Sequence, residues 1–138
     1  MVDLDYHVIK FLFKSPYSMK IGEIKKALKI PHSTLGSCIK RLKKQNLVKY
    51  EPYHEVFLTI DGIELAKELN RHSRLLELLL HKELALDPSK AHVESEKFSL
   101  LFTCETIQRI CEKYNHPEQC PCGEKIFNSS ACFCEKEI

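Results

Sequence analysis

The spacing of apolar residues predicts helices in the first third of the chain. Val8, Ile9 and Leu12 recur at helical intervals within residues 5–14. A second segment repeats this pattern over two turns, and its apolar face consists of Ile21, Ile24, Ala27 and Leu28. Two short helices, each with one apolar face, are therefore expected before residue 30.

A third helix is expected to begin at a cap formed by Ser33 or its neighbour and to end near Gln45. Residues 29–32 connect it tightly to the second helix. Its apolar stripe, which we expect to be buried, consists of Leu35, Cys38, Ile39 and Leu42. Two short helices joined in this way are typical of a helix-turn-helix.

The next segment predicts a hairpin wing followed by a long helix. Residues 47–50 and 56–59 are rich in β-forming residues, and the turn-forming residues 51–55 separate them. A long helix then runs from Thr59 to about Leu84. Three short helices, a wing and a long helix predict a mainly α fold that begins with a winged helix-turn-helix.

The later part of the chain predicts a helical domain and a tail. Residues 75–80 place leucines around most of the long helix, which predicts packing within the domain and against a second copy of the chain. Asp87-Pro88 is a break, and a last helix is expected over about residues 103–114. We therefore expect a winged-helix DNA-binding domain, a helical dimerisation domain and a cysteine-rich tail at residues 1–62, 63–117 and 118–138.

Charge is distributed unevenly along the chain. Residues 1–50 hold eleven Lys or Arg and three acids, a net charge of +8, whereas the remaining residues carry −6. A basic front half is expected of a surface that binds phosphates, and a merely solvated charged face is the alternative.

Several classes of function are not expected. Neither a cleavable leader nor a run of eighteen apolar residues is recognised, so we expect a cytoplasmic protein with no membrane partner. A glycine-rich phosphate loop, a nucleophile motif and an open catalytic zinc set are also not recognised. Neither an enzyme nor a small organic substrate is therefore expected.

Candidate DNA contacts lie on the third helix, opposite its apolar stripe. Small hydroxyl residues at its N-terminal end can approach base edges in the major groove, and the later Lys and Arg suit phosphates. These residues are Ser33, Thr34, Ser37, Lys40, Arg41 and Lys44. Tyr53 and His54 at the wing tip are further candidates, although an ordinary turn also accounts for them. The expected partner is double-stranded DNA with a palindromic operator, bound by a homodimer.

Four of the seven cysteines form two Cys-x-Cys pairs, Cys120 with Cys122 and Cys132 with Cys134. An odd number of cysteines excludes a fully paired set of intramolecular disulfides, and clustering favours a metal over a reduced tail without one. A proline and a glycine flank Cys122 and allow the sharp turn that such close ligands require. Four thiolates suit Zn²⁺ or an iron–sulfur cluster, although structural zinc more often uses Cys-x-x-Cys.

Five strings of residues together carry a resemblance. They are Leu35–Val48, Leu58–Gly62, Arg71–Leu80, Ala91–Ile110 and His116–Gly123, the last being the most specific, with the form His-Pro-x-x-Cys-Pro-x-Gly. The chain resembles the diphtheria toxin repressor family of metal-dependent regulators over about residues 1–126. The resemblance implies a homodimer with an N-terminal winged helix, in which Fe²⁺ or Mn²⁺ promotes operator binding.

The resemblance also implies where a regulatory metal is held, and the chain departs from that pattern. Positions of the family's primary ligands fall at Tyr6, Glu96, Ser99 and Leu100. Only Glu96 suits a metal, so we expect the primary site to be lost.

The family's secondary site is partly retained. Glu77 and His92 match its pattern, while its first histidine falls at Ser73, beside His72. His72, Glu77 and His92 are therefore expected to offer a degenerate site for Fe²⁺ or Mn²⁺, and Cys111 is a further candidate ligand. The alternative is that these are ordinary helix-surface side chains.

Together these patterns predict a sequence-specific transcriptional regulator, a repressor, that responds to iron, another metal or redox state. Loss of the primary site in an iron-sensing family favours an iron–sulfur cluster on Cys120, Cys122, Cys132 and Cys134. Either the loaded or the empty form could bind DNA. The alternatives are a purely structural four-cysteine zinc site and a winged helix that binds proteins and not DNA.

Overall fold

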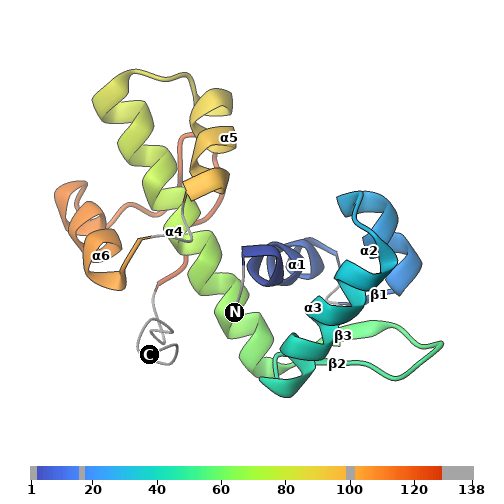
Figure 1. Cartoon of the computed structure of the whole chain (residues 1–138). Coiled ribbons are helices and arrows are strands. Elements are labelled where there is room, and N and C mark those ends of the chain that lie inside the picture. The colour runs from blue at the N-terminus through green and yellow to red at the C-terminus, as the bar shows by residue number, and fades with distance from the viewer. Residues whose placement is uncertain (1–2, 16–17, 99–101, 129–138) are drawn as a thin grey trace. The chain divides into compact units, whose positions relative to one another are not determined.

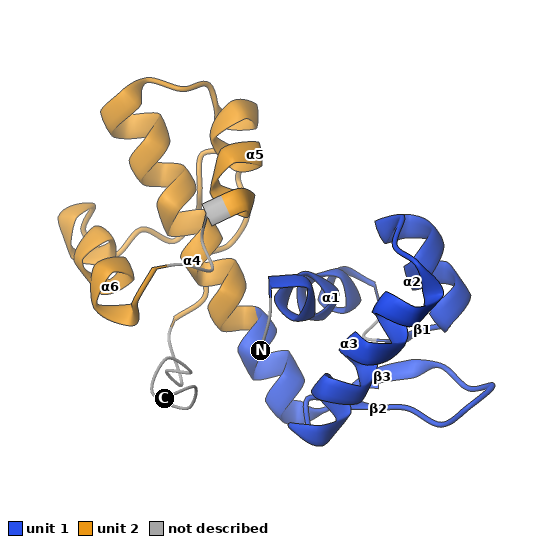
Figure 2. Ribbon diagram, viewed as in Figure 1, with its two compact units in different colours: residues 1–66 blue, residues 67–138 orange. Residues whose placement is uncertain are grey.

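A computed structural model describes residues 3–15, 18–98 and 102–128 of the chain (Figure 1). It separates into two compact units, residues 1–66 and 67–138, and the boundary falls inside the long helix α4 (Figure 2). Each unit encloses its own buried apolar side chains.

The first unit begins with the three predicted helices, α1 (Asp3–Lys14), α2 (Ile21–Leu28) and α3 (His32–Lys44). The whole predicted stripe of α3 is buried. The predicted cap of α3 is wrong, because Pro31 is the N-cap and no side chain caps the helix. The proline ring holds φ at −63°, which leads the extended connection directly into the first turn. Ser33 is instead an exposed residue of that turn.

A small antiparallel sheet forms the wing. The predicted hairpin is confirmed as β2 (Val48–Lys49) and β3 (Val56–Leu58), with Val48 paired to Leu58. Strand β1 (Ser18–Met19), which adds to the other side of β3, has no local sequence pattern that predicts it. In the described part of the chain the strand order is β1-β3-β2.

The core of the first unit explains why α3 has a fixed place. Val8, Ile9 and Leu12 of α1 are fully buried, and α1 contacts both α3 and β3. The apolar stripe of α3 and the inward strand residues Val48 and Val56 close the same core. Burial of the stripe leaves the opposite side of α3 exposed, as expected for an amphipathic helix.

The second unit consists of the C-terminal part of α4 (Ile60–Leu84) with α5 (Pro88–Phe98) and α6 (Cys104–Lys113). The predicted long helix and last helix are confirmed. The side chain of Thr103 caps α6 by accepting a hydrogen bond from the amide of Thr106 at 3.2 Å. No helix of the described residues is long and apolar enough to cross a membrane.

Helix α5 differs from the sequence prediction, in which Asp87-Pro88 is only a break. The structure makes the same pair a helix start. Asp87 Oδ1 accepts hydrogen bonds from the amide of Lys90 at 3.0 Å and the hydroxyl of Ser89 at 2.8 Å, and Pro88 is the first helical residue. An Asp cap followed by proline is a recognised helix-start signal, which was available in the sequence.

Gly62 sets how closely α4 approaches the wing. It is buried in the first turn of α4, and a Cβ atom at this position would lie 2.1 Å from the carbonyl oxygen of Leu47. A backbone oxygen cannot move aside as a flexible side chain can. Only glycine therefore allows this contact.

We predict that Gly62→Ala lowers the free energy of unfolding by about 2 kcal/mol or more, because the methyl group has no space. Gly36→Ala on α3 is the matched control, since nothing lies within 4 Å of its Cβ position. The control is expected to raise the free energy of unfolding by about 0.5–1 kcal/mol through helix propensity. Chemical denaturation measures both, and equal effects of the two substitutions would contradict the packing argument.

Candidate nucleic-acid surface and metal centre

The candidate DNA contacts of α3 form an exposed polar face. This face consists of Ser33, Thr34, Ser37, Lys40 and Lys44, all exposed. The hydroxyl residues lie in the first two turns and the lysines in the last two. This arrangement matches a helix whose N-terminal end reaches bases while its later turns lie along phosphates.

Arg41, the remaining candidate on α3, is paired with a buried carboxylate of the same unit. Its guanidinium donates to both carboxylate oxygens of Asp5 on α1, through Nε at 3.0 and 3.2 Å and through Nη2 at 2.8 Å. Asp5 is fully buried, and this contact raises the pKa of Arg41. Burial and the neighbouring Asp5 also raise the pKa of the Cys38 thiol to about 12. The structure therefore gives Arg41 a structural partner; a DNA contact through it stays a prediction.

The wing tip carries the two remaining candidates for DNA contact. Tyr53 has a left-handed backbone, with φ of 69°, and is fully exposed. His54 is also exposed, and its amide donates to the carbonyl of Glu51 at 3.1 Å, which closes the turn. An exposed aromatic ring at a tight turn is available to a partner.

Three potential metal ligands converge in the second unit. Ligand atoms of Glu77 on α4, His92 on α5 and Cys122 after α6 all lie within 4.8 Å of one another. Nδ1 of His92 lies 2.9 Å from Oε1 of Glu77, and the amide of Cys122 donates to Oε2 at 3.3 Å. The Glu77 side chain is only 1% exposed. A carboxylate, an imidazole and a thiol together are a typical set for a divalent transition metal.

A tight turn, Cys120–Gly123, which we term the cysteine turn, brings the thiols to this place. The amide of Gly123 donates to the carbonyl of Cys120 at 2.8 Å, and the amide of Cys120 donates to the carbonyl of Glu124 at 2.9 Å. Gly123 has φ of +89°, a conformation that favours glycine. The sequence prediction of a sharp turn here is confirmed.

Two arginines of α4 attach the residues after the cysteine turn to the helix. Arg74 forms an ion pair with Glu124 at 3.1 Å and donates to the carbonyl of Lys125. Arg71 donates to the carbonyl of Phe127 at 3.1 Å. Because Glu77 lies on the same helix, these contacts hold the cysteine turn beside it.

The two thiols of the turn have different surroundings. Cys120 is buried in an apolar cluster that also contains Leu75, Ile107, Ile110, Cys111 and Ile126. Cys122 is exposed, and its thiol donates to the carbonyl of Pro88 at 3.4 Å. Desolvation and then the hydrogen bond with Glu77 raise the pKa of Cys122 to about 11 and also raise the pKa of Cys120. A metal that binds here must therefore displace a proton from sulfur.

The other predicted ligands lie elsewhere. His72 is beside Glu68 and Cys104, not beside Glu77. Cys111 is buried, with Sγ 3.3 Å from Nδ1 of His116. Cys132 and Cys134, like Ser99 and Leu100, lie outside the described residues. Tyr6 is in α1 and Glu96 in α5.

Sequence reasoning missed that Cys122 joins Glu77 and His92. Thiol spacing predicts Cys122 as a ligand, and the family pattern independently predicts Glu77 and His92. Only folding reveals that they form one group, because 45 residues separate Glu77 from Cys122. Glu68 and Cys104 were missed as ligands altogether. The spacing of Glu68 and His72, four residues apart on a helix, was the available signal.

Comparison with known proteins agrees with these features. Residues 59–128 match the family described as iron dependent repressor, metal binding and dimerisation domain. An uncharacterized HTH-type transcriptional regulator of Methanocaldococcus jannaschii is 30% identical over 100 residues, which are 72% of this chain and 80% of that protein. The diphtheria toxin repressor of Corynebacterium glutamicum is 28% identical over 93 residues, 67% of this chain and 41% of that protein. The chain thus spans less than half of that repressor.

Solved structures share the fold. A hypothetical protein from Sulfolobus solfataricus matches with a TM-score of 0.75 and 28% identity, over 90% of this chain and 95% of that one. The manganese regulator SloR matches with a TM-score of 0.80 and 21% identity, over 96% of this chain and 63% of that one. IdeR of T. acidophilum matches with a TM-score of 0.74 and 21% identity, over 94% of this chain and 61% of that one.

We predict that Arg41→Ala lowers the free energy of unfolding by about 2 kcal/mol, because it leaves the buried carboxylate of Asp5 without its cation. The figure is below that for a fully buried pair, since Arg41 is 39% exposed and solvent screens part of the interaction. Lys40→Ala, one residue earlier and exposed, is the control. It should change the free energy of unfolding by less than about 0.5 kcal/mol. Urea denaturation measures the free energy of unfolding of both variants. An Arg41→Ala protein as stable as the unsubstituted protein would exclude a structural role for Arg41.

Proposed function

The chain belongs to the family of iron-dependent repressors, and on this basis we propose that it is a metal-responsive regulator of transcription that binds operator DNA as a homodimer. Members of this family regulate transcription and are not enzymes. The observation that carries the proposal is the convergence of Glu77, His92 and Cys122 in a chain whose helix α3 also exposes a polar, basic face.

The burial of Glu77 supports a metal at this group. A carboxylate in a desolvated position costs free energy unless opposite charge and hydrogen bonds offset it. The partners that the structure gives Glu77 include an imidazole and a backbone amide. A divalent ion held by Glu77, His92 and Cys122 would supply the missing positive charge, and it would connect α4, α5 and the cysteine turn.

The donor atoms favour some ions over others. One nitrogen, one oxygen and one sulfur suit Fe²⁺ or Zn²⁺, whereas Mn²⁺ prefers oxygen ligands. We therefore propose Fe²⁺ as the regulatory ion, with Zn²⁺ as the ion to exclude by experiment. ScaR, a solved structure with the same fold, is described with bound Zn²⁺ and with bound Cd²⁺.

An iron–sulfur cluster on Cys120, Cys122, Cys132 and Cys134 is the second candidate. The two Cys-x-Cys pairs favour it, and the close approach of Cys120 and Cys122 within one turn is compatible with it. A purely structural Zn²⁺ would use the same four thiolates. The cluster and the structural zinc site both require Cys122, as the mononuclear site does. Only one of the three centres can therefore form on a given chain.

The proposed DNA surface is the polar face of α3 together with Tyr53 and His54. Lys40 and Lys44 would contact phosphates, and Ser33, Thr34 and Ser37 would approach bases. The excess of positive charge in residues 1–50 supports DNA as the partner over another protein.

A groove in the second unit supports the homodimer. It lies between the end of α4 and α5, and its apolar lining comes from Leu80, Leu84, Leu86 and Val93. Leu84 is 64% exposed and Val93 54% exposed. Exposed apolar residues in a segment that matches a dimerisation domain favour a second copy of the chain as the partner.

To test the metal proposal, DNA would be selected from a random double-stranded library with Fe²⁺-loaded protein under anaerobic conditions. We expect a chelator to weaken binding to the selected DNA by about tenfold or more, which corresponds to about 1.4 kcal/mol. Glu77→Gln and Cys122→Ser should abolish this difference, because each removes a ligand. Cys111→Ser, a thiol outside the group, is the control and should retain it. Full metal dependence in both ligand variants would refute the proposal.

The same preparation separates the two kinds of metal centre. A mononuclear site predicts iron without acid-labile sulfide and no loss of metal in Cys132→Ser. A cluster predicts equal amounts of iron and sulfide, a brown protein, and loss of both in Cys132→Ser. Zinc alone, in a colourless protein that loses the zinc in Cys132→Ser, would favour the structural four-cysteine site.

A further substitution tests the dimer. We expect Val93→Glu to convert the dimer to monomers at micromolar concentration, because it buries a carboxylate in an apolar interface. Arg109→Glu on α6 is the control, since Arg109 is exposed and outside the groove. Sedimentation velocity measures both; a Val93→Glu protein that remains dimeric would place the interface elsewhere.

A further inference from the structure

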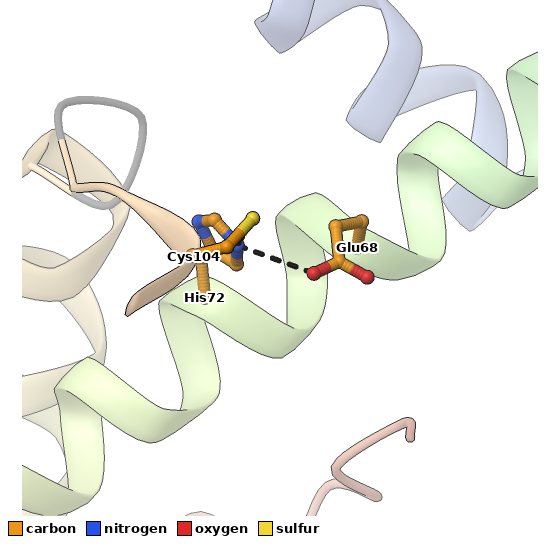
Figure 3. Close-up of side chains that lie close together, drawn as sticks. All are labelled: Glu68, His72 and Cys104. Atoms are coloured by element: carbon orange, nitrogen blue, oxygen red, sulfur yellow. Dashed lines mark hydrogen bonds and ion pairs between the residues drawn. The ribbon is translucent and has the colours of Figure 1, made fainter. Parts of the chain in front are cut away.

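We propose that Glu68, His72 and Cys104 form a second metal site, which binds a divalent transition ion of the Zn²⁺ type. Glu68 and His72 lie on α4, and Cys104 is the first residue of α6 (Figure 3). Their ligand atoms all lie within 4.8 Å of one another. The site shares no residue with the group of Glu77, His92 and Cys122, and it does not depend on the function proposed for that group.

The helix itself aligns the first two ligands. Glu68 and His72 are four residues apart, so both side chains point from the same face of α4. Nε2 of His72 lies 3.4 Å from Oε1 of Glu68 and 3.9 Å from Sγ of Cys104. One ring nitrogen thus faces an oxygen and a sulfur together.

The separation of His72 from Glu68 is longer than a usual hydrogen bond, and both separations are close to those expected around a bound ion. A hydrogen bond from nitrogen to oxygen has a length of about 2.9 Å, and a ring nitrogen serves one such bond at a time. Around a tetrahedral Zn²⁺, bond lengths of about 2.0 Å to N and O and about 2.3 Å to S separate nitrogen from oxygen by about 3.3 Å and nitrogen from sulfur by about 3.5 Å. The observed separations are within about 0.4 Å of these values.

Burial and charge agree with this assignment. The side chains of Glu68 and His72 are both only 7% exposed, and Cys104 is half-buried, so an ion could enter from its side. The first turn of a helix favours a negatively charged group, here a thiolate. A carboxylate, a thiolate and a neutral imidazole sum to −2, which a divalent ion balances.

The ion would join α4 to α6 across 32 residues. Sulfur and imidazole ligands select Zn²⁺ or Fe²⁺ over Mg²⁺ and Ca²⁺, which require oxygen. The site would therefore tie the second unit together in the presence of a borderline transition metal.

The test uses the full chain with Cys120, Cys122, Cys132 and Cys134 all replaced by serine, which removes the thiols of the other proposed sites. After treatment with a chelator, this protein is titrated with Co²⁺, a spectroscopic substitute for Zn²⁺. We expect one equivalent to bind with thiolate-to-cobalt charge-transfer absorption. Adding Cys104→Ser should abolish this absorption, and adding Cys111→Ser, on the same face of α6, should leave it intact.

A second variant keeps the proposal open to refutation if Cys104→Ser does not fold, as circular dichroism would reveal. Glu68→Gln in the same background retains the thiol and the size of the side chain, and it should weaken Co²⁺ binding by about tenfold or more. The proposal is wrong if the four-serine protein gives no charge-transfer absorption, if the absorption survives Cys104→Ser, or if Glu68→Gln leaves the affinity unaltered. None of these outcomes depends on whether Glu77 binds a regulatory metal.

Discussion

The second unit depends on the cost of burying the carboxylate of Glu77. A negative charge 1% exposed to solvent persists in a fold only where neighbouring groups compensate for the lost water. Here the imidazole of His92 and the amide of Cys122 do so from two different segments. One buried acid therefore determines where α5 and the cysteine turn lie against α4. Any ion that the group binds enters a position already organised for positive charge.

The first unit contains the same arrangement with a different partner. Asp5 of α1 is fully buried and receives three hydrogen bonds from Arg41 of α3. This contact fixes α3 against α1 through a rigid guanidinium fork, whose carboxylate partner is fully buried. Each unit thus places a carboxylate, Asp5 or Glu77, inside its core. In the first unit the guanidinium of Arg41 neutralises the Asp5 carboxylate permanently, whereas in the second the proposed metal ion would neutralise Glu77 only while it is bound.

The sequence predicted the fold well wherever apolar spacing was regular. The stripe of α3 and the hairpin wing followed from local periodicity, which depends on residues close together in the chain. Local reasoning was less successful with ends and partners. Asp87-Pro88 predicts a break as readily as a helix start, because proline ends a helix in its interior and favours one at its first position. Arg41 was assigned to the DNA surface because the helix places it beside Lys40 and Lys44, and only the fold reveals Asp5 beneath it. Cys122 was grouped with the other tail thiols because contacts over 45 residues leave no local pattern.

The 45 residues between Glu77 and Cys122 also determine the order in which the two units are completed during synthesis. A nascent chain that has emerged as far as α4 already contains residues 1–66, and thus the whole first unit with its Asp5–Arg41 pair. Glu77 and His92 follow, but the amide and thiol of Cys122 emerge only after a further 30 residues of synthesis. Closing so long a loop is slow compared with forming local helices. The first unit is therefore synthesised before the proposed ligand set is complete, and the proposed metal response requires that Cys122 has reached Glu77.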